Sequence, residues 1–207
     1  MAGTEDKFHK EVHQVIHHNI HNYIDSAALY LTDIIKKKVE TKDEEGLTFT
    51  CMAAGTMLAF SFEAYLNAIG SRKLPLWNER DDYYKKIDKV FQHLEIAPDW
   101  GTRPYSSVSA IRRLRNTLAH GQPEVVERKK SFIDKVDGQK GKTMNFTAEW
   151  QALCTPELII KANDDLSDVW KEMYKKSGID VMDLTTHGNA TLTTGKKFVP
   201  TGKPLKK

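Results

Sequence analysis

One segment limits the possible folds of this chain more than any other. Residues 47–69, "LTFTCMAAGTMLAFSFEAYLNAI", are apolar on nearly every face when wound into a helix, and Gly70 follows them. Glycine is a common residue at a helix end. A helix that is apolar all round has to be surrounded by other elements of the fold. The segment therefore predicts the central helix of a helical bundle.

The remaining segments supply helices to surround it. Residues 4–42 carry apolar side chains at intervals of three and four, which is the period of an amphipathic helix. Gly121 followed by Pro123 marks the end of another helix. Thr155 followed by Pro156 marks the start of the last one. The predicted fold class is an all-α bundle of four long helices and one short helix, over residues 4–42, 47–69, 106–120 and 155–178, and 78–94.

Two further segments lack this periodicity. Residues 127–150 are rich in Lys, Gly and Asp and predict a loop, with a short strand at 143–150. No acidic residue follows Asp183, whereas five lysines lie there among Gly, Thr and Pro: Lys196, Lys197, Lys203, Lys206 and Lys207. Such a composition is typical of a disordered, solvated segment. We expect a helical domain over residues 1–184 and a basic flexible tail over residues 185–207.

Composition and charge narrow the class of protein. A chain of 207 residues with 40% hydrophobic residues can bury one good core. The formal net charge is only +3, so any affinity for nucleic acid has to come from local clusters of cations. Cys51 and Cys154 lie in apolar company without metal-ligand spacing and predict buried, reduced thiols. We see no signal peptide and no apolar stretch of membrane-spanning length, so we expect a cytoplasmic protein without a membrane contact.

Histidines recur near the N-terminus. His9, His13, His17 and His21 are spaced by four residues, and His18 stands beside them. On a helix a step of four residues turns by about 40°, so adjacent pairs could share a metal ion. In the other interpretation, which we prefer, the histidines line the polar side of an amphipathic helix. No metal and no other cofactor is therefore expected.

The most unusual stretch is "AIRRLRNTLAHGQP", residues 110–123. It places three arginines, an asparagine and a histidine at the end of a predicted helix: Arg112, Arg113, Arg115, Asn116 and His120. Cleavage of RNA by its own 2′-OH needs a group that moves protons near neutral pH and a fixed cation for the charge on the phosphoryl oxygens. Histidine suits the first role and arginine the second. An amide can orient the imidazole or the phosphate by hydrogen bonding. The sequence has neither a phosphate-binding glycine loop, nor a nucleophile elbow, nor paired-cysteine zinc spacing.

Arg115, Asn116 and His120 resemble the signature of the HEPN (higher eukaryotes and prokaryotes nucleotide-binding) domains. That signature is an arginine, about four to six residues and a histidine, usually with a polar residue directly after the arginine. The segment "FEAYLN", residues 62–67, resembles the acid and the asparagine that the family carries on a buried helix. The resemblance covers roughly residues 8–178.

The resemblance implies an all-α bundle, commonly a homodimer, in which two signatures face each other and cut RNA without a metal ion. The products are then a 2′,3′-cyclic phosphate and a 5′-OH. Arg115, Asn116 and His120 would be the catalytic residues. The biological setting would be toxin–antitoxin or antiviral defence, in which an antitoxin or other regulatory protein silences the ribonuclease. The alternative is a non-catalytic HEPN module that binds nucleotide, RNA or a protein partner.

Helix geometry leaves the choice of the catalytic arginine open. Residues five apart on an ideal helix point about 140° apart, so Arg115 and His120 would not share a face. Arg113, Asn116 and His120 would fall within about 60° of one another. Arg113 also satisfies the signature spacing, with six residues before His120. We expect Arg115 to be catalytic, with Arg113 as a phosphate contact or substitute and Arg112 as a second phosphate contact.

Supporting residues are predicted on the central helix. Glu63 and Asn67 are polar groups in an otherwise apolar helix and need partners, for which Arg115 or Arg113 is the obvious choice. Glu63 could equally form a purely structural ion pair. Aromatic residues near the motif are candidates for stacking on RNA bases: Trp77, Trp100 and Tyr105. A third interpretation treats the motif as a helix end, where arginines complement the dipole and a histidine caps carbonyls, in an unrelated helical adaptor.

Overall fold

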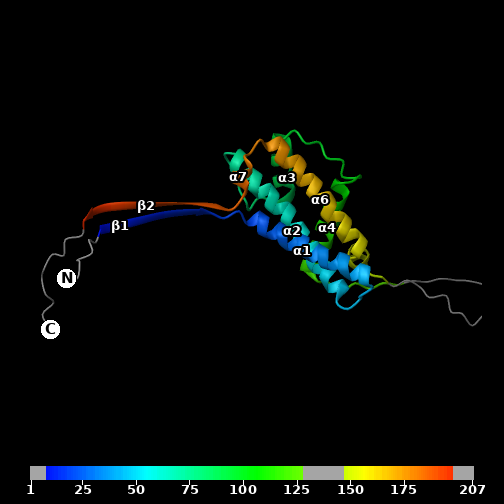
Figure 1. Cartoon of the computed structure of the whole chain (residues 1–207). Coiled ribbons are helices and arrows are strands. Elements are labelled where there is room, and N and C mark those ends of the chain that lie inside the picture. Colours follow the sequence, from blue (N-terminus) through cyan, green and yellow to red (C-terminus); the bar gives the residue numbers. More distant parts are fainter. Residues whose placement is uncertain (1–7, 128–146, 198–207) are drawn as a thin grey trace, which may run out of the picture. The chain divides into compact units, whose positions relative to one another are not determined.

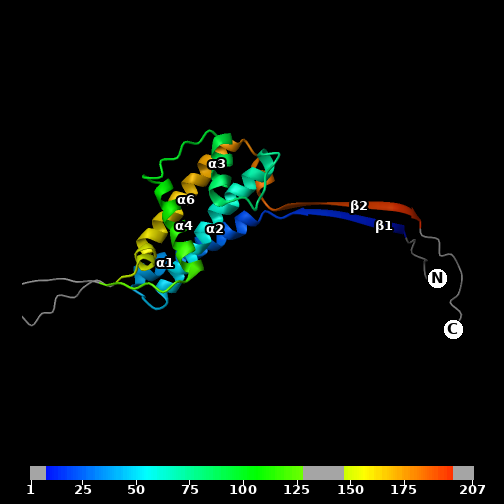
Figure 2. The same ribbon diagram turned by 180° about the vertical axis from the view of Figure 1, so that it is seen from behind.

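The computed structural model describes residues 8–127 and 147–197, and this part of the chain is mostly helical (Figures 1 and 2). The elements follow one another as β1 (Phe8–His17), α1 (Ile20–Thr41), α2 (Leu47–Lys73), α3 (Tyr83–His93), α4 (Tyr105–His120), α5 (Glu149–Leu153), α6 (Pro156–Ser177), α7 (Val181–Leu184) and β2 (His187–Lys197). The described residues divide into two compact units, residues 20–179 without the gap at 128–146 and residues 8–19 with 180–197. Four of the helices are long and α3 is shorter, as predicted, but α5 and α7 are two further short helices that the sequence analysis did not predict.

Helix α2 is the centre of the helical unit, and the prediction from its composition is confirmed. It packs against α1, α3, α4 and α6. Phe62, Leu66 and Ile69 are fully buried in these contacts. Gly55 lets α4 come close, because a Cβ atom there would lie 2.6 Å from Cδ2 of Leu114. The side chains of α2 are therefore apolar on most faces because other helices cover them.

One expectation about this helix needs correction. By length and composition alone, α2 is apolar enough to cross a membrane, contrary to the expectation that no stretch reaches that length. The core helix of a bundle passes the same test of length and hydropathy, because it too has few polar residues. Its buried residues are spread along the whole helix, from Cys51 to Gly70.

Helix α4 carries the arginine-rich motif on a firmly packed support. Val108, Ile111 and Leu114 are buried and lie one helical turn apart, facing α2 and α6. The helix ends at Gly121, whose φ of 53° is left-handed and favours glycine. The beginning differs from the prediction: the helix starts at Tyr105, and no side chain caps it.

Ser107, in the first turn of α4, contacts another helix. The Ser107 hydroxyl donates to a carboxylate oxygen of Asp165 on α6, and Arg103 binds the same carboxylate through a 2.6 Å ion pair. Asp165 is 5% exposed, so its charge needs both partners. The network joins the start of α4 to α6.

Helix α6 begins and ends as predicted. Thr155 accepts a hydrogen bond from the Leu158 amide, and Pro156 occupies the first turn. Gly178 ends the helix in a left-handed conformation. The two cysteines, Cys51 and Cys154, are buried and unpaired, as expected.

The N-terminal segment and the C-terminal segment were predicted wrongly. Residues 8–17 form strand β1 instead of the first part of a helix, and the helix begins only at Ile20. Residues 187–197 of the expected flexible tail form β2, which pairs with β1 in antiparallel register from His17↔His187 to Lys10↔Thr194. Residues 198–207 of that tail lie outside the described residues. The spacing of apolar residues in β1 is also compatible with a helix, but hydrogen bonds with β2, which is distant in sequence, make the segment a strand.

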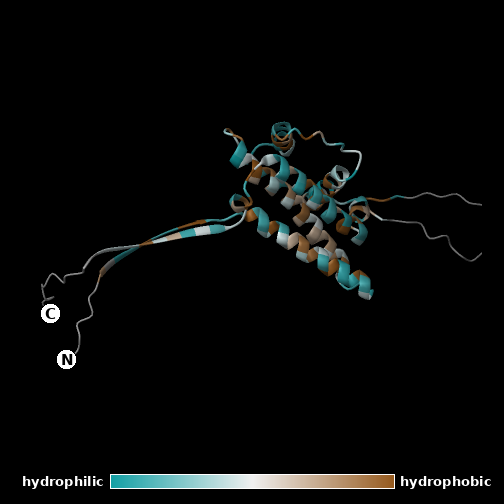
Figure 3. Ribbon diagram, turned by 45° about the horizontal axis from the view of Figure 1, so that its top comes forward, coloured by the Kyte–Doolittle hydropathy of each residue, from teal (hydrophilic) through white to brown (hydrophobic). Residues whose placement is uncertain are grey.

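Helix α1 buries some of its apolar side chains, whereas the paired strands expose apolar ones. In Figure 3 teal and brown alternate along α1, whose buried residues include Ala28 and Ile35. The strands expose apolar residues such as Val12 and Leu192.

The strand expected at residues 143–150 is wrong in the part that the structure describes, because Glu149 and Trp150 belong to α5. Residues 143–146 lie outside the described residues.

Candidate active site

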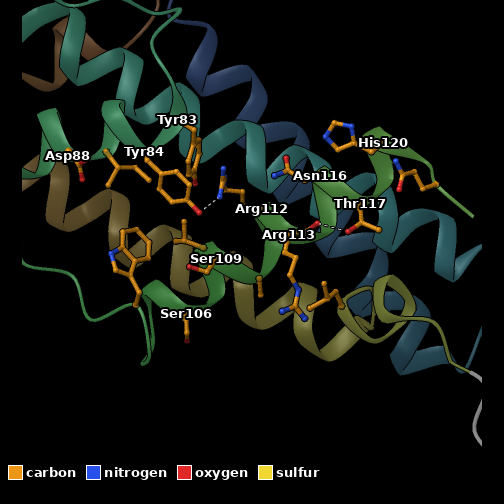
Figure 4. Close-up of a pocket in the computed structure, with 16 residues that line it drawn as sticks. Tyr83, Tyr84, Asp88, Ser106, Ser109, Arg112, Arg113, Asn116, Thr117 and His120 are labelled. Atoms are coloured by element: carbon orange, nitrogen blue, oxygen red, sulfur yellow. Dashed lines mark hydrogen bonds between the residues drawn. The ribbon is translucent and has the colours of Figure 1, made fainter. Parts of the chain in front are cut away.

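A groove of about 1070 Å³ runs along α4 and is the setting of the arginine-rich motif (Figure 4). We call it the α4 groove. Its walls come from α3, α4 and the segments next to α4, and its lining includes Tyr83, Tyr84, Asp88, Trp100, Ser106, Ser109, Arg112, Arg113, Asn116, Thr117, His120 and Gln122. A groove of this volume can hold a drug-sized or nucleotide-sized ligand.

The groove brings together four of the five site residues predicted in the motif and leaves one out. Arg112, Arg113, Asn116 and His120 line it, whereas Arg115 does not. Helix geometry explains this division, because residues 113, 116 and 120 share one face of a straight helix. The structure therefore places Arg113, and not Arg115, on the same side of α4 as His120.

Arg115 is turned toward the central helix. Its Nη2 lies 3.4 Å from Oε2 of Glu63, and its guanidinium carbon lies 5.5 Å from the ring centre of Phe60. Its Nη1 donates a hydrogen bond of 2.8 Å to Oδ1 of Asn116. This bond uses one lone pair of the Asn116 amide oxygen and leaves the amide NH₂ as the group that can donate into the groove.

Glu63 is bound by a second cation that sequence reasoning missed. Lys86 of α3 is only 2% exposed, donates to a Glu63 carboxylate oxygen and donates to the Glu79 carbonyl oxygen at 3.0 Å. Its position offered a signal, since Lys86 falls on the apolar stripe of α3 between Tyr83 and Val90. A buried lysine needs an anion, and Glu63 is that anion.

Asn67 does not join this cluster through its oxygen. In the part of the chain that the structure describes, its Oδ1 is buried and has no hydrogen-bond partner. The expected pairing of Asn67 with Arg115 or Arg113 through this atom is therefore wrong. The ion pair of Glu63 with Arg115 is present.

His120 stands at the exposed end of α4. It is the last residue of the helix, and Gly121 turns the chain away directly after it. Its side chain is exposed and lines the groove, and Figure 4 shows it on the same side as Asn116. The ring is thus accessible to a ligand without any rearrangement of the core.

Arg113 is held only loosely. Its Nε lies 3.1 Å from Oε1 of Glu149 at the start of α5, and the two side chains are 61% and 62% exposed. An ion pair this exposed contributes little to stability, about 0.2–1 kcal/mol. A phosphate could therefore replace Glu149 as the partner of Arg113 at low cost.

Two tyrosines of α3, Tyr83 and Tyr84, form a wall of the groove. Arg112 lies over both rings, 4.4 Å from the centre of Tyr83 and 4.1 Å from that of Tyr84, and it donates to the Tyr84 hydroxyl. Burial raises the pKa of Tyr83 above its ordinary value, so its hydroxyl stays protonated. Two consecutive tyrosines at the start of a helix were the available signal for this wall. Neighbours on a helix point about 100° apart, so two adjacent rings cover a wider part of the helix surface than one ring does.

The aromatic candidates from the sequence fall in different places. Trp100 lines the groove. Tyr105 is 7% exposed, donates a 2.6 Å hydrogen bond to Glu172 and contacts the ring of Trp100, so it supports Trp100. Trp77 packs close to Gly70 at the end of α2 and does not line the groove.

The N-terminal histidines that are spaced by four residues do not lie along one helix in the structure. His13 and His17 lie on strand β1, where a step of four residues spans about 13 Å, too far to share one metal ion. His17 stacks on His187 of the paired strand at 4.9 Å. His21 lies in α1 and is 3% exposed. Within residues 8–127 and 147–197, no group of three or more His, Cys, Asp or Glu residues could hold a metal ion.

Comparison with known proteins adds no relative. No protein-family model matches the chain, and neither the curated proteins nor the solved structures contain a match. The α4 groove and its residues are therefore the basis for any functional assignment.

Proposed function

We propose that this chain is a metal-independent endoribonuclease of the HEPN type and that the α4 groove is its active site. One observation carries the proposal: Arg113, Asn116 and His120 lie on one face of α4 and line one groove, next to exposed aromatic side chains. A cation, an amide and an imidazole are the groups that cleavage through the 2′-OH needs.

The reaction assigns a distinct task to each residue. A base removes the proton of the 2′-OH, the 2′ oxygen bonds to phosphorus, the bond to the 5′ oxygen breaks, and that oxygen receives a proton. His120 is the proton-transfer group, since histidine exchanges protons near neutral pH. Arg113 balances the negative charge on the phosphoryl oxygens, and the Asn116 NH₂ donates a hydrogen bond to one of them.

The residues behind the groove set the orientation of Asn116. Lys86 and Arg115 both bind Glu63, and Arg115 in turn binds the Asn116 amide oxygen. Arg115 is thus a positioning residue in this proposal, while Arg113 takes the contact with the phosphate. This assignment exchanges the roles that the motif alone suggests for the two arginines.

Proton transfer to and from two oxygens is easier with two histidines than with one. We propose that a homodimer supplies the second His120 and that the two grooves face each other across an isologous interface. A toxin–antitoxin or antiviral defence setting, with a regulatory protein that silences the enzyme, belongs to the same proposal.

End-group analysis of RNA is the decisive test. Purified protein is incubated with single-stranded RNA in EDTA, and the new ends are examined for a 2′,3′-cyclic phosphate and a 5′-OH. We expect both ends to form, and the His120→Ala variant to yield neither. RNA that stays intact at high enzyme concentration, with or without added metal, would refute the nuclease. Binding without cleavage would then assign the chain to the non-catalytic modules that hold nucleotide or RNA.

A further inference from the structure

The α4 groove has a second end, away from His120. Figure 4 shows Tyr84, Asp88 and Ser109 at one end of the groove and His120 at the other. The eight steps along α4 from Arg112 to His120 correspond to about 12 Å along the helix axis. The groove is therefore long enough to have two subsites with different chemistry.

Tyr84 is fixed in position and remains accessible. The Arg112 guanidinium covers its ring at 4.1 Å from the centre and donates to its hydroxyl. Tyr83 meets it edge-on, with ring centres 5.8 Å apart and planes at 80°. Tyr84 is nevertheless 59% exposed. An aromatic ring that is held from one side and open on the other is a surface on which a planar ligand can stack.

Trp100 provides a second aromatic surface. Its ring is nearly parallel to Phe91, at an angle of 7° and 6.2 Å between centres, and it meets Tyr105 at 67°. These contacts fix the indole, while 36% of the residue stays exposed and lines the groove. Fixing the ring in advance lowers the entropy that a ligand loses on binding.

The charges at this end favour a base over a phosphate. Asp88 is exposed and lines the groove beside Tyr84, so its carboxylate repels phosphate. A carboxylate accepts hydrogen bonds from base N–H groups, as Asp and Glu do from cytosine. The exposed hydroxyl of Ser109 can donate or accept at the same place.

We propose that Tyr84, Trp100 and Asp88 form a binding site for an unstacked base of a single-stranded nucleic acid. The adjoining phosphates then run past Arg113 toward His120. The two rings supply stacking, which tolerates any base, and Asp88 supplies a hydrogen-bond acceptor that favours bases with N–H donors. This site deepens the proposed function and rests on it for the identity of the strand as RNA.

Binding to a strand that cannot be cut tests the site apart from catalysis. The probes are a labelled single-stranded oligodeoxynucleotide, which lacks the 2′-OH, and an abasic strand of equal length. By fluorescence anisotropy the wild-type protein should bind the base-bearing strand about tenfold more tightly. Tyr84→Leu should remove most of this preference. Tyr30→Leu is the matched control, because Tyr30 is 68% exposed on α1 and does not line the groove.

A phosphate contact gives a different result from a base contact. Arg113→Ala should lower the affinity for the base-bearing strand and for the abasic strand by the same factor, so the preference for bases stays unchanged. Asp88→Asn should narrow the differences in affinity among strands of different base composition. Circular dichroism melting shows whether each variant is folded.

Two results would overturn the base site. One is a wild-type protein that binds abasic and base-bearing strands equally, and the other is a folded Tyr84→Leu variant that keeps the full preference. If RNA stays uncut but the preference for bases and its loss in Tyr84→Leu are observed, the nuclease proposal fails and the base site stands.

Discussion

Nη1 of Arg115 donates a 2.8 Å hydrogen bond to Oδ1 of its sequence neighbour Asn116. The two side chains serve different sides of α4: Arg115 pairs with Glu63 of α2, and Asn116 lines the groove. The charged side chains of Lys86, Glu63 and Arg115 are therefore connected to the groove through the amide of Asn116. The consequences for the two arginines of the motif are opposite and can be measured.

Arg115→Ala is expected to act on the rate, because it removes the partner that orients Asn116. We predict a lower kcat on RNA with little change in RNA affinity. It also leaves Glu63 with Lys86 alone, and the loss of this partly exposed ion pair should cost about 1 kcal/mol in the free energy of unfolding. Single-turnover kinetics and urea denaturation measure the two effects.

Arg113→Ala is expected to act on binding. It should weaken RNA affinity and lower the slope of log affinity against log salt by about one unit, as the loss of one phosphate contact does. Arg80→Ala is the matched control, since Arg80 is exposed and does not line the groove. An Arg113→Ala variant with normal affinity and salt slope would contradict its assignment as the phosphate contact.

His120→Ala should abolish cleavage without affecting the fold. Loss of a proton-transfer group lowers the rate by about 10²- to 10⁴-fold, while an exposed residue at a helix end costs only about 1 kcal/mol at most. The measurements are RNA cleavage in EDTA and thermal melting. His93→Ala serves as control because His93 is also exposed in the last turn of a helix. A large drop in melting temperature for His120→Ala alone would identify a structural cap instead.

Glu149→Gln should tighten RNA binding. In the free protein Glu149 forms an ion pair with Arg113, with 3.1 Å between Oε1 and Nε. A phosphate that binds Arg113 therefore has to displace Glu149. Removal of an exposed ion pair and its negative charge should raise the affinity at low salt about two- to fivefold. Asp168→Asn breaks a similarly exposed pair with Lys171 and should leave the affinity unchanged. Equal effects from both variants would mean that general charge, and not Arg113, is responsible.

His21 should make the stability of the helical unit fall in acid. Burial, with a smaller contribution from the charge of Arg72, lowers the pKa of His21 to about 4 from 6.5. Between these values the unfolded chain binds the proton and the folded chain does not, so protonation favours unfolding. The stabilisation from the neutral ring is complete above pH 6.5 and is lost as the pH falls toward 4.

Urea denaturation at two pH values measures this effect. From pH 7.5 to pH 5, the contribution of His21 to the free energy of unfolding should decrease by on the order of 2 kcal/mol. The His21→Leu variant should lose less stability over that interval than the wild-type protein. His93→Gln, at an exposed histidine, should follow the wild-type protein. Identical pH dependence in all three proteins would show that His21 titrates normally.

Much of the helical unit follows from local patterns. The uniform apolarity of residues 47–69 predicts a central helix, and the Gly121 and Gly178 stop signals predict two helix ends that the structure has. These features depend on side chains within a few turns of one another, which a single sequence displays directly. The same local pattern is misleading for residues 8–17, whose strand depends on pairing with residues 187–197.

The sequence by itself determined the helical bundle, the central place of residues 47–69 in it and the cluster of arginines, asparagine and histidine at the end of the helix that stops at Gly121. Only the tertiary structure decided which arginine shares a groove with His120, and that Lys86 and Glu63 hold the other one toward α2. It also decided that Tyr84 and Trp100 both line that groove. Spacing along one helix sets directions around its axis, but partners from other helices lie far away in sequence, and only packing brings their charges and rings within contact distance.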